Sequence, residues 1–278
     1  MQWQRIKRIL IALLLSLFLP GLGQAYNRQP RKAILLSGAI PILYFASGIL
    51  ELLHHFAGLI LHVVLFSGLS LFIVGDAVWV AGKPRDSLRP GVNTKLLYIC
   101  LAVLVSFNLF AFSTDFYFDK VLGVRPYRIP SDSMTPTIIV GDRIITDMRH
   151  YLKHSPQRGD LVILRSPLDD SLQIKRVIAV GGDVLAGNRQ SVSVDGERIQ
   201  EPYLQPVPGE ESVLDDPYDE YGPLRIPANQ FFVMGDNRLH SFDSRQPRFG
   251  TVGIERIRGK PLFVYWSGDR KRIGKAIR

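Results

Sequence analysis

The sequence predicts N-terminal transmembrane helices followed by a mainly β domain with an antiparallel, folded sheet. Three observations lead to this fold class. Four apolar runs lie within residues 1–118, and short segments rich in Val, Ile and Phe follow in residues 119–278. Charge divides the chain similarly: residues 1–95 hold ten Lys and Arg against three Asp and Glu, whereas the remainder holds 24 against 22. Basic residues beside apolar runs are typical of membrane proteins and argue against a soluble enzyme, a disordered chain or a nucleic-acid-binding protein.

The apolar runs differ in length, which decides which of them are expected to span a membrane. A helix needs roughly 20 residues to cross the hydrocarbon core. The runs at 33–53 and 56–80 reach this length, and the run at 96–114 approaches it. The first run is shorter and is interrupted by Pro20-Gly21. We therefore expect residues 9–26 to form a re-entrant or interfacial helix rather than a span.

Basic residues orient these segments, because loops rich in Lys and Arg stay in the cytoplasm. Two basic clusters place the domain at 119–278 on the extracytoplasmic side; they are Arg28, Arg31 and Lys32, and Lys83, Arg85, Arg89 and Lys95. A full span at 9–26 would instead turn the basic N-terminal residues outward. A cleaved signal peptide ending near Gly23-Gln24-Ala25 would invert the remaining loops, so the charge pattern disfavours it.

Three single residues in the apolar runs are candidates for special roles. A carboxylate at membrane depth is a candidate functional group, but Asp76 lies near the cytoplasmic end of its run and is expected to reach lipid headgroups. His62 is expected to serve helix packing. Cys100 is the only cysteine, so neither an intrachain disulfide nor a zinc site with paired cysteines can form.

The outer part of the sequence shows partial period-two alternation of apolar residues, which is typical of half-buried strands. We expect strands at 143–147, 161–164, 172–180, 191–194, 230–234, 251–257 and 262–266. Gly-Asp pairs between these segments suit turns. Because helices do not alternate with the strands, a mainly antiparallel, folded-over sheet is predicted.

An acidic, proline-rich surface loop is expected at 201–224, since residues 201–221 hold seven acidic residues and no basic one. Four of these could be imagined as calcium ligands, namely Asp215, Asp216, Asp219 and Glu220. Their spacing lacks the glycine and the regularly placed ligands of an EF-hand. We therefore do not assign a calcium site to this loop.

Chemistry is expected at two serines in a stiff segment. Residues 128–137 read Arg-Ile-Pro-Ser-Asp-Ser-Met-Thr-Pro-Thr, so prolines flank Ser131 and Ser133. Residues i and i+2 of an extended chain point to the same side, and both hydroxyls could therefore address one reacting group. The sequence has no Gly-x-Ser-x-Gly elbow and no histidine in an evident triad context.

A serine hydroxyl needs a base, and without a suitable histidine a neutral lysine remains. Lys175 lies in the strand-like run at 172–178. Burial among apolar groups lowers the pKa of a lysine from its usual value of about 10.4. Arg176 would point to the opposite face of the strand. On spacing alone, however, a lysine in a strand is usually an ordinary charge at a sheet edge.

Four motifs between residues 129 and 250 resemble, in order, those of type I signal peptidases (leader peptidases), which use a Ser-Lys dyad. Residues 130–137 are similar to the nucleophile motif, and residues 158–162 to the strand motif that follows it. Residues 174–178, with Gly182-Asp183, resemble the lysine motif. The family's last motif is matched by Gly235-Asp236-Asn237-Arg238 followed by Ser241, Asp243, Ser244 and Arg245.

The resemblance implies roles for particular residues. It implies that Ser133 is the nucleophile and Lys175 the general base. It implies that the Ser131 hydroxyl and the Ser133 backbone N–H form the oxyanion hole, and that the Ser241 hydroxyl orients Lys175. Supporting roles are expected for Asp243 and Arg245, as an ion pair, and for Arg176.

The resemblance also implies an activity and a location. It implies a serine endopeptidase, multi-pass in the bacterial cytoplasmic membrane, with its catalytic domain on the extracytoplasmic side. Such an enzyme removes signal peptides from exported preproteins after Ala-x-Ala-like sites, contacts membrane lipids and works near the secretion translocon. It needs no metal and no organic cofactor.

Some residues depart from the family pattern. Asp132 stands where a small residue is common, and we expect its carboxylate to point away from the side shared by the two serines. Leu239-His240 replaces a more polar pair, and residues 246–249 lengthen the approach to Gly250. The several apolar runs exceed the common one- or two-span anchor. These departures bear on substrate range.

Two alternatives stay open at this stage: a specialised peptidase of the same superfamily, such as one that matures pilin for conjugation, and a non-catalytic membrane scaffold with a peptidase-like domain. The soluble Ser-Lys repressor autoproteases share the chemistry, but this chain shows no DNA-binding helix pair. The basic tail at 270–278 could touch anionic lipid or simply be solvated.

Overall fold

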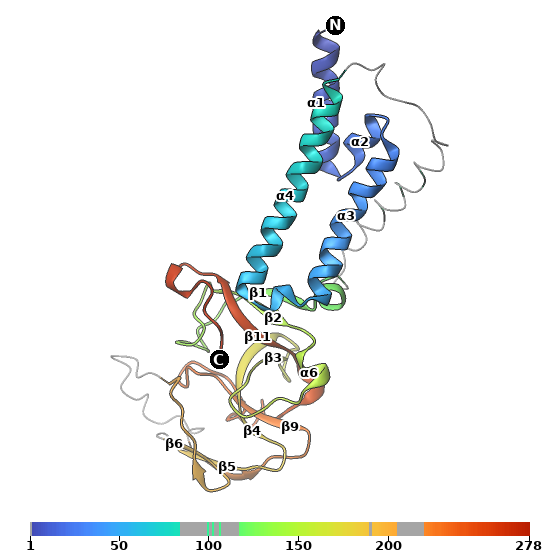
Figure 1. Ribbon diagram of the computed structural model, residues 1–278. Coiled ribbons are helices and arrows are strands. Elements are labelled where there is room, and N and C mark those ends of the chain that lie inside the picture. Colours follow the sequence, from blue (N-terminus) through green and yellow to red (C-terminus); the bar gives the residue numbers. More distant parts are fainter. Residues whose placement is uncertain are drawn as a thin grey trace. The chain divides into compact units, whose positions relative to one another are not determined.

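The computed structural model describes residues 2–83, 117–188, 191–204 and 220–278, together with the single residues 99, 102 and 106. The chain divides into two compact units, Met1–Gly123 and Val124–Arg278 (Figure 1). Apart from the three single residues, the expected span at 96–114 lies outside the described residues. So do Asp215, Asp216 and Asp219 of the calcium-site alternative and most of the acidic loop.

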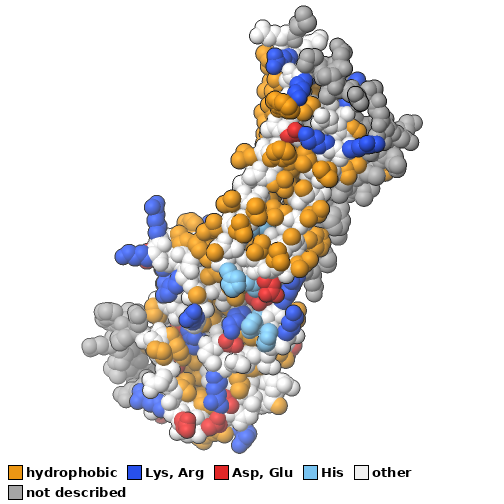
Figure 2. Space-filling view, in the orientation of Figure 1, with side chains coloured by type: hydrophobic (Ala, Val, Ile, Leu, Met, Phe, Trp, Pro, Cys, Tyr) orange, Lys and Arg blue, Asp and Glu red, His pale blue; other side chains and the backbone are white. Residues whose placement is uncertain are grey.

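The N-terminal unit is helical. Its elements are α1 (Gln2–Phe18), α2 (Leu22–Tyr26), α3 (Pro30–Ile49), η1 (Leu52–His54), α4 (Phe56–Ala81) and the π-helical turn η3 (Tyr117–Leu122). Helices α3 and α4 correspond to the apolar runs at 33–53 and 56–80, and both are long and apolar enough to cross a membrane. Figure 2 shows many apolar side chains at the surface of these helices. Leu35, Ile42, Leu71 and Phe72 are among the exposed ones.

Helices α1 and α2 form a hairpin whose two ends meet the same end of α4. At one end, a methyl group built on Gly82 would lie 3.7 Å from Arg5 Nη2. At the other end, Asn27 Nδ2 donates to the Ala77 carbonyl at 2.7 Å. Gly21 makes the turn between the helices with φ +92°, a conformation that favours glycine. The break expected at Pro20-Gly21 is therefore a reversal of the chain.

Asp76 does not reach outward as expected but is held inside this unit. Its carboxylate accepts from Lys32 Nζ at 2.5 Å and from Gln24 Nε2 at 3.2 Å. The expectation of a headgroup contact was wrong because a lysine from α3 and a glutamine from the hairpin supply its partners. His62 lies 2.7 Å from Ser47 Oγ and joins α4 to α3, which agrees with the helix-packing interpretation.

The second unit is mainly β. Its strands are β1 (Val124–Arg128), β2 (Arg143–Asp147), β3 (Leu161–Arg165), β4 (Leu172–Val180), β5 (Val184–Asn188), β6 (Ser191–Val194), β7 (Glu197–Arg198), β8 (Tyr221–Arg225), β9 (Gln230–Met234), β10 (Val252–Gly253) and β11 (Ile257–Trp266). The short helices α6 (His150–Lys153), η4 (Ile254–Arg256) and η5 (Arg270–Arg272) lie between or after them. Within the described residues these strands form a seven-stranded sheet, in the order β1-β2-β11-β3-β4-β9-β10, and a four-stranded sheet, β7-β6-β5-β8.

Every strand pair in the two sheets is antiparallel, as the sequence predicts. Strands β2, β4, β6 and β9 have the predicted bounds. The strand predicted at 251–257 is confirmed only in part: β10 covers Val252–Gly253, residues 254–256 form the 3-10 turn η4, and β11 starts at Ile257. Strands β1, β5, β7 and β8 were not predicted.

Strand β4 lies between β3 and β9, and its register positions the site. Lys175 is opposite Val162 of β3, and Arg176 is opposite Met234 of β9. A core cluster under this part of the sheet is made of Ile129, Met134, Ile138, Ile144, Leu161, Ile163, Val264 and Ile277. Lys175 therefore lies on a central strand of the larger sheet and is buried.

Candidate active site

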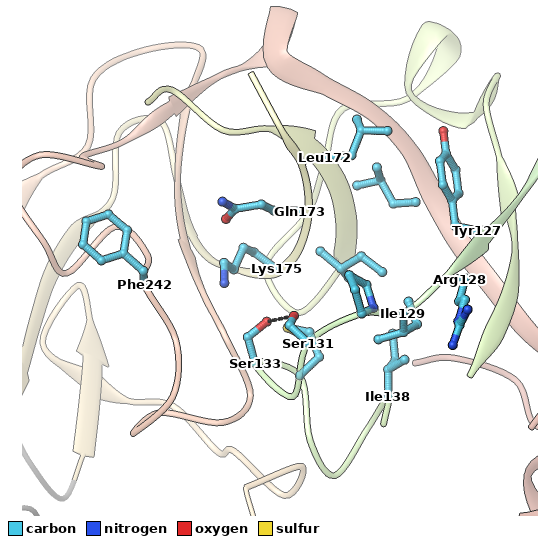
Figure 3. Close-up of a pocket in the computed structure, with 14 residues that line it drawn as sticks. Tyr127, Arg128, Ile129, Ser131, Ser133, Ile138, Leu172, Gln173, Lys175 and Phe242 are labelled. Atoms are coloured by element: carbon cyan, nitrogen blue, oxygen red, sulfur yellow. Dashed lines mark hydrogen bonds between the residues drawn. The ribbon is translucent and has the colours of Figure 1, made fainter. Parts of the chain in front are cut away.

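A pocket of about 290 Å³ lies in the β unit beside strand β4. Its walls are Tyr127, Arg128, Ile129, Pro130, Ser131, Ser133, Met134, Ile138, Ile163, Leu172, Gln173, Ile174, Lys175 and Phe242. Most of these side chains are apolar. Figure 3 shows the Lys175 amine pointing toward the two serine hydroxyls. The pocket therefore places a few polar groups within an otherwise apolar lining.

Ser131 and Ser133 belong to the serine segment, residues 129–142, which joins β1 to β2. Their Oγ atoms lie 3.4 Å apart. Met134 and Ile138 of the same segment are buried in the core cluster. The buried apolar residues fix the segment, and the serines remain accessible at the pocket.

The last motif holds the serine segment from the other side. Asn237 N–H donates to the Ser133 carbonyl at 3.0 Å, and its side-chain amide donates to the Asp132 carbonyl at 3.3 Å. Gly235 lies between Ser133 and Ser241: a Cβ there would stand 2.5 Å from the Ser133 carbonyl oxygen and would overlap the Ser241 side chain. The close approach of these segments therefore requires a glycine.

Lys175 is 3% exposed, and its Nζ donates to Ser241 Oγ at 2.9 Å. Among the described residues it forms no ion pair and makes no hydrogen bond to Ser133, although both side chains line the pocket. Ser241 is itself buried. One N–H of the amine is thus engaged with Ser241, and the rest of the amine faces the pocket.

Burial lowers the pKa of Lys175 from 10.5 to about 8. The charge of Asp243 opposes this lowering, and that of Arg245 adds to it. About a tenth of the amines would then be neutral at pH 7, against roughly one in 3,000 at a pKa of 10.5. A neutral amine is the form that can accept a proton.

Asp243 and Arg245 explain why burial dominates. Both side chains are buried, and Arg245 Nε and Nη2 donate to the two Asp243 oxygens at 2.9 and 3.1 Å. Arg245 also donates to the Ser241 carbonyl at 3.3 Å, and Gly235 N–H donates to Asp243 at 3.0 Å. The pair therefore supports the turn that carries Ser241 while its two charges act on Lys175 in opposite directions.

Arg176 lies next to Lys175 but is fully paired. Its guanidinium donates to both Asp236 oxygens at 2.8 and 2.7 Å and to the Gly159 carbonyl at 2.8 Å. The Thr137 hydroxyl donates to the same Asp236 carboxylate at 2.5 Å. Arg176 thus joins the lysine motif, the last motif and the serine segment without lining the pocket.

Asp132 and His240, two departures from the family pattern, meet in space. Asp132 Oδ2 lies 2.9 Å from His240 Nδ1, and both side chains are about half exposed. The lengthened segment after Arg245 folds inward, where Gln246 Oε1 accepts from Asp243 N–H at 2.7 Å.

Sequence reasoning missed the roles of Gly235, Asn237 and Thr137, which depend on partners about 100 residues away. The basic tail is not simply solvated as one alternative held, because Arg272 pairs with the buried Asp142 and Ile277 lies in the core. In the described part of the chain, no cluster of three His, Cys, Asp or Glu side chains could hold a metal ion.

Comparisons with known proteins agree on one family. The profile described as "Signal peptidase, peptidase S26" matches residues 96–266. Signal peptidase I of Mycobacterium tuberculosis is 30% identical over 247 residues, covering 70% of this chain and 79% of that protein. Signal peptidase I S of Bacillus subtilis is 33% identical over 190 residues, covering 68% and 94%.

A third relative, probable signal peptidase I-1 of Synechocystis, is 36% identical over 196 residues and covers 68% of this chain and 87% of its own length. Among solved structures, a signal peptidase I from Enterococcus faecalis is 28% identical and covers 38% of this chain and 97% of its own, with a TM-score of 0.33.

Proposed function

Because this chain belongs to the signal peptidase family, peptidase S26, we propose that Ser133 is its nucleophile and that neutral Lys175 is the general base. The chain is a serine endopeptidase that removes signal peptides. The observation that carries the proposal is the buried Lys175 amine, which shares a pocket with Ser133 and has a pKa near 8.

The proposed reaction is acyl transfer in two steps. Neutral Lys175 takes the Ser133 proton, and the alkoxide attacks the scissile carbonyl. The protonated lysine then donates its proton to the leaving amine. A water, deprotonated by Lys175, attacks the acyl-enzyme, and the proton returns to Ser133. The Ser241 bond to Lys175 leaves the amine lone pair free to face Ser133.

The negative oxygen of the tetrahedral intermediate needs hydrogen-bond donors, and the Ser131 hydroxyl would supply one. Its hydroxyl lies 3.4 Å from Ser133 Oγ on the same side of the segment. Together with the Ser133 backbone N–H it would form the oxyanion hole. A donor of this kind is worth roughly 2.7–4 kcal/mol of transition-state stabilisation.

We propose that the pocket selects small residues at Ala-x-Ala-like sites. The walls beside the serines include Ile129, Met134 and Ile174. Ile129 and Met134 are buried, so a charged substrate side chain against them would be costly, because burying an unpaired charge is unfavourable.

The test is processing of an exported preprotein by the detergent-solubilised chain, with the new N-terminus mapped by mass spectrometry. Cleavage after a small-x-small site, lost in Ser133→Ala, is expected. The acid limb of kcat/KM should have its midpoint near pH 8, because only neutral Lys175 is a base. Cleavage elsewhere, or an active Ser133→Ala variant, would refute the proposal.

We propose a multi-pass arrangement in the cytoplasmic membrane with the peptidase unit outside, where it meets preprotein signal peptides, lipids and the translocon. Signal peptidase I relatives are membrane-anchored, and α3 and α4 suit this role. The hairpin of α1 and α2 would enter and leave on the cytoplasmic side.

Cysteine labelling tests this topology. In a Cys100→Ser background, Glu197→Cys should react with an impermeant maleimide on intact cells, and Gln4→Cys should react only after permeabilisation. The reverse pattern would overturn this topology.

A further inference from the structure

The tail segment, residues 270–278, is part of the β unit's core structure. It returns along β11, where Gly274 N–H donates to the Val264 carbonyl at 2.8 Å and Ile277 N–H to the Leu262 carbonyl at 2.9 Å. Ile277 is 8% exposed and packs in the same core cluster as Met134 and Ile138 of the serine segment. The tail segment therefore supports the serine segment directly.

Arg272 makes the polar part of this contact. Its Nη2 donates to the Thr137 carbonyl at 2.9 Å and to Asp142 Oδ2 at 2.6 Å, and its Nε donates to Asp142 at 3.1 Å. The arginine side chain is 11% exposed and the Asp142 side chain is fully buried. A guanidinium fork that bridges a carboxylate and a carbonyl fixes both in direction as well as in distance.

Asp142 closes the base of the serine segment. Its carbonyl accepts from Ile129 N–H at 2.9 Å, and its carboxylate accepts from Ile139 N–H at 3.2 Å. Thr137 is held from two sides, because its hydroxyl donates to Asp236 while its carbonyl accepts from Arg272. The stretch with Ser131 and Ser133 lies between these two fixed points.

We propose that Arg272 is a positioning residue for the peptidase reaction, which holds the serine segment so that Ser133 meets Lys175 correctly. This inference rests on the proposed function, in which Ser133 is the nucleophile. Arg272 does not line the pocket, so it acts through Thr137 and Asp142. A displacement of about 1 Å at a reacting group can cost on the order of 100-fold in rate.

The test compares Arg272→Gln with Lys271→Gln in the full-length, detergent-solubilised chain. Both variants remove one positive charge from the tail segment, but Lys271 is exposed. For Arg272→Gln we expect kcat to fall at least about tenfold with KM within about twofold, and acylation of Ser133 by a mechanism-based inhibitor to slow equally. Lys271→Gln should match the unaltered chain. Arg272→Lys keeps the charge but not the forked guanidinium, and its kcat should lie between those of Arg272→Gln and the unaltered chain.

Structural loss is separated from positioning by expressing rates per folded molecule, measured by circular dichroism. If Arg272→Gln does not fold, Asp142→Asn weakens the same contact and should lower kcat with KM unchanged. Unchanged kcat in the folded variants would overturn the proposal, as would an equal loss in Lys271→Gln, which would indicate lipid attraction instead. Failure of the Ser-Lys mechanism would appear separately, as activity retained by Ser133→Ala.

Discussion

The two sides of strand β4 carry neighbouring buried cations that are treated in opposite ways. Arg176 has a bidentate carboxylate partner in Asp236, whereas the hydrogen bond of Lys175 goes to a neutral hydroxyl. A buried charge with a full set of partners is a structural element. A buried amine without a counter-ion gives up its proton more readily. Arg176 therefore serves the structure of the site, whereas Lys175 is suited to its chemistry.

The largest effect is expected from changing the unpaired cation. Lys175→Ala removes the proposed base, and Lys175→Arg replaces it with a cation that stays protonated at working pH. Both should lower kcat/KM on a preprotein by at least about 1,000-fold. Gel-based processing assays measure this. Substantial turnover by purified Lys175→Arg would show that a neutral amine is not needed.

Removing the carboxylate partner of Arg176 should lower the stability of the fold. Asp236→Ala leaves the Arg176 guanidinium buried without its carboxylate, and such a change costs about 3–5 kcal/mol. Denaturant unfolding in detergent, followed by tryptophan fluorescence, would measure it. A decrease of less than about 1 kcal/mol in the free energy of unfolding would mean that the Arg176–Asp236 pair contributes little to stability.

Replacing the unpaired lysine by an apolar residue should stabilise the fold. The pKa of Lys175 is lowered on folding, so the unfolded chain binds the extra proton between pH 8 and 10.5, and stability rises with pH across that window. The penalty below pH 8 is about 3 kcal/mol. Lys175→Met should therefore be more stable at pH 7, with the difference vanishing near pH 10.5. Equal stability at both pH values would contradict the lowered pKa.

The smallest effect is expected at the exposed pair of Asp132 and His240. Ion pairs at this exposure contribute about 0–1 kcal/mol. His240→Ala should change kcat/KM by no more than about threefold and should leave the acid-limb midpoint in place. A shifted midpoint would show that this pair communicates with Lys175 after all.

Local sequence signals predicted much of the β unit, because strands such as β4 and β9 show their burial in their own composition. Strand β1 was missed since Pro126 argues against a strand interior, and β8 since Gly222-Pro223 reads as a turn. Ser131, Ser133 and Lys175 stand out locally or through the family resemblance. Gly235 and Thr137 lie within the motifs, but their roles, like that of Arg272, arise only when distant segments meet.

The single hydrogen that forms the side chain of Gly235 sets the width of the gap between two catalytic loops. A larger side chain at position 235 would clash with the Ser133 carbonyl oxygen. This oxygen belongs to the main chain, so no second substitution can remove it. Removing the Ser241 side chain would relieve only half of the overlap. Substitutions at position 235 are therefore blocked by main chain, and a redesign of substrate range would start from residues that line the pocket, such as Ile174 or Leu172.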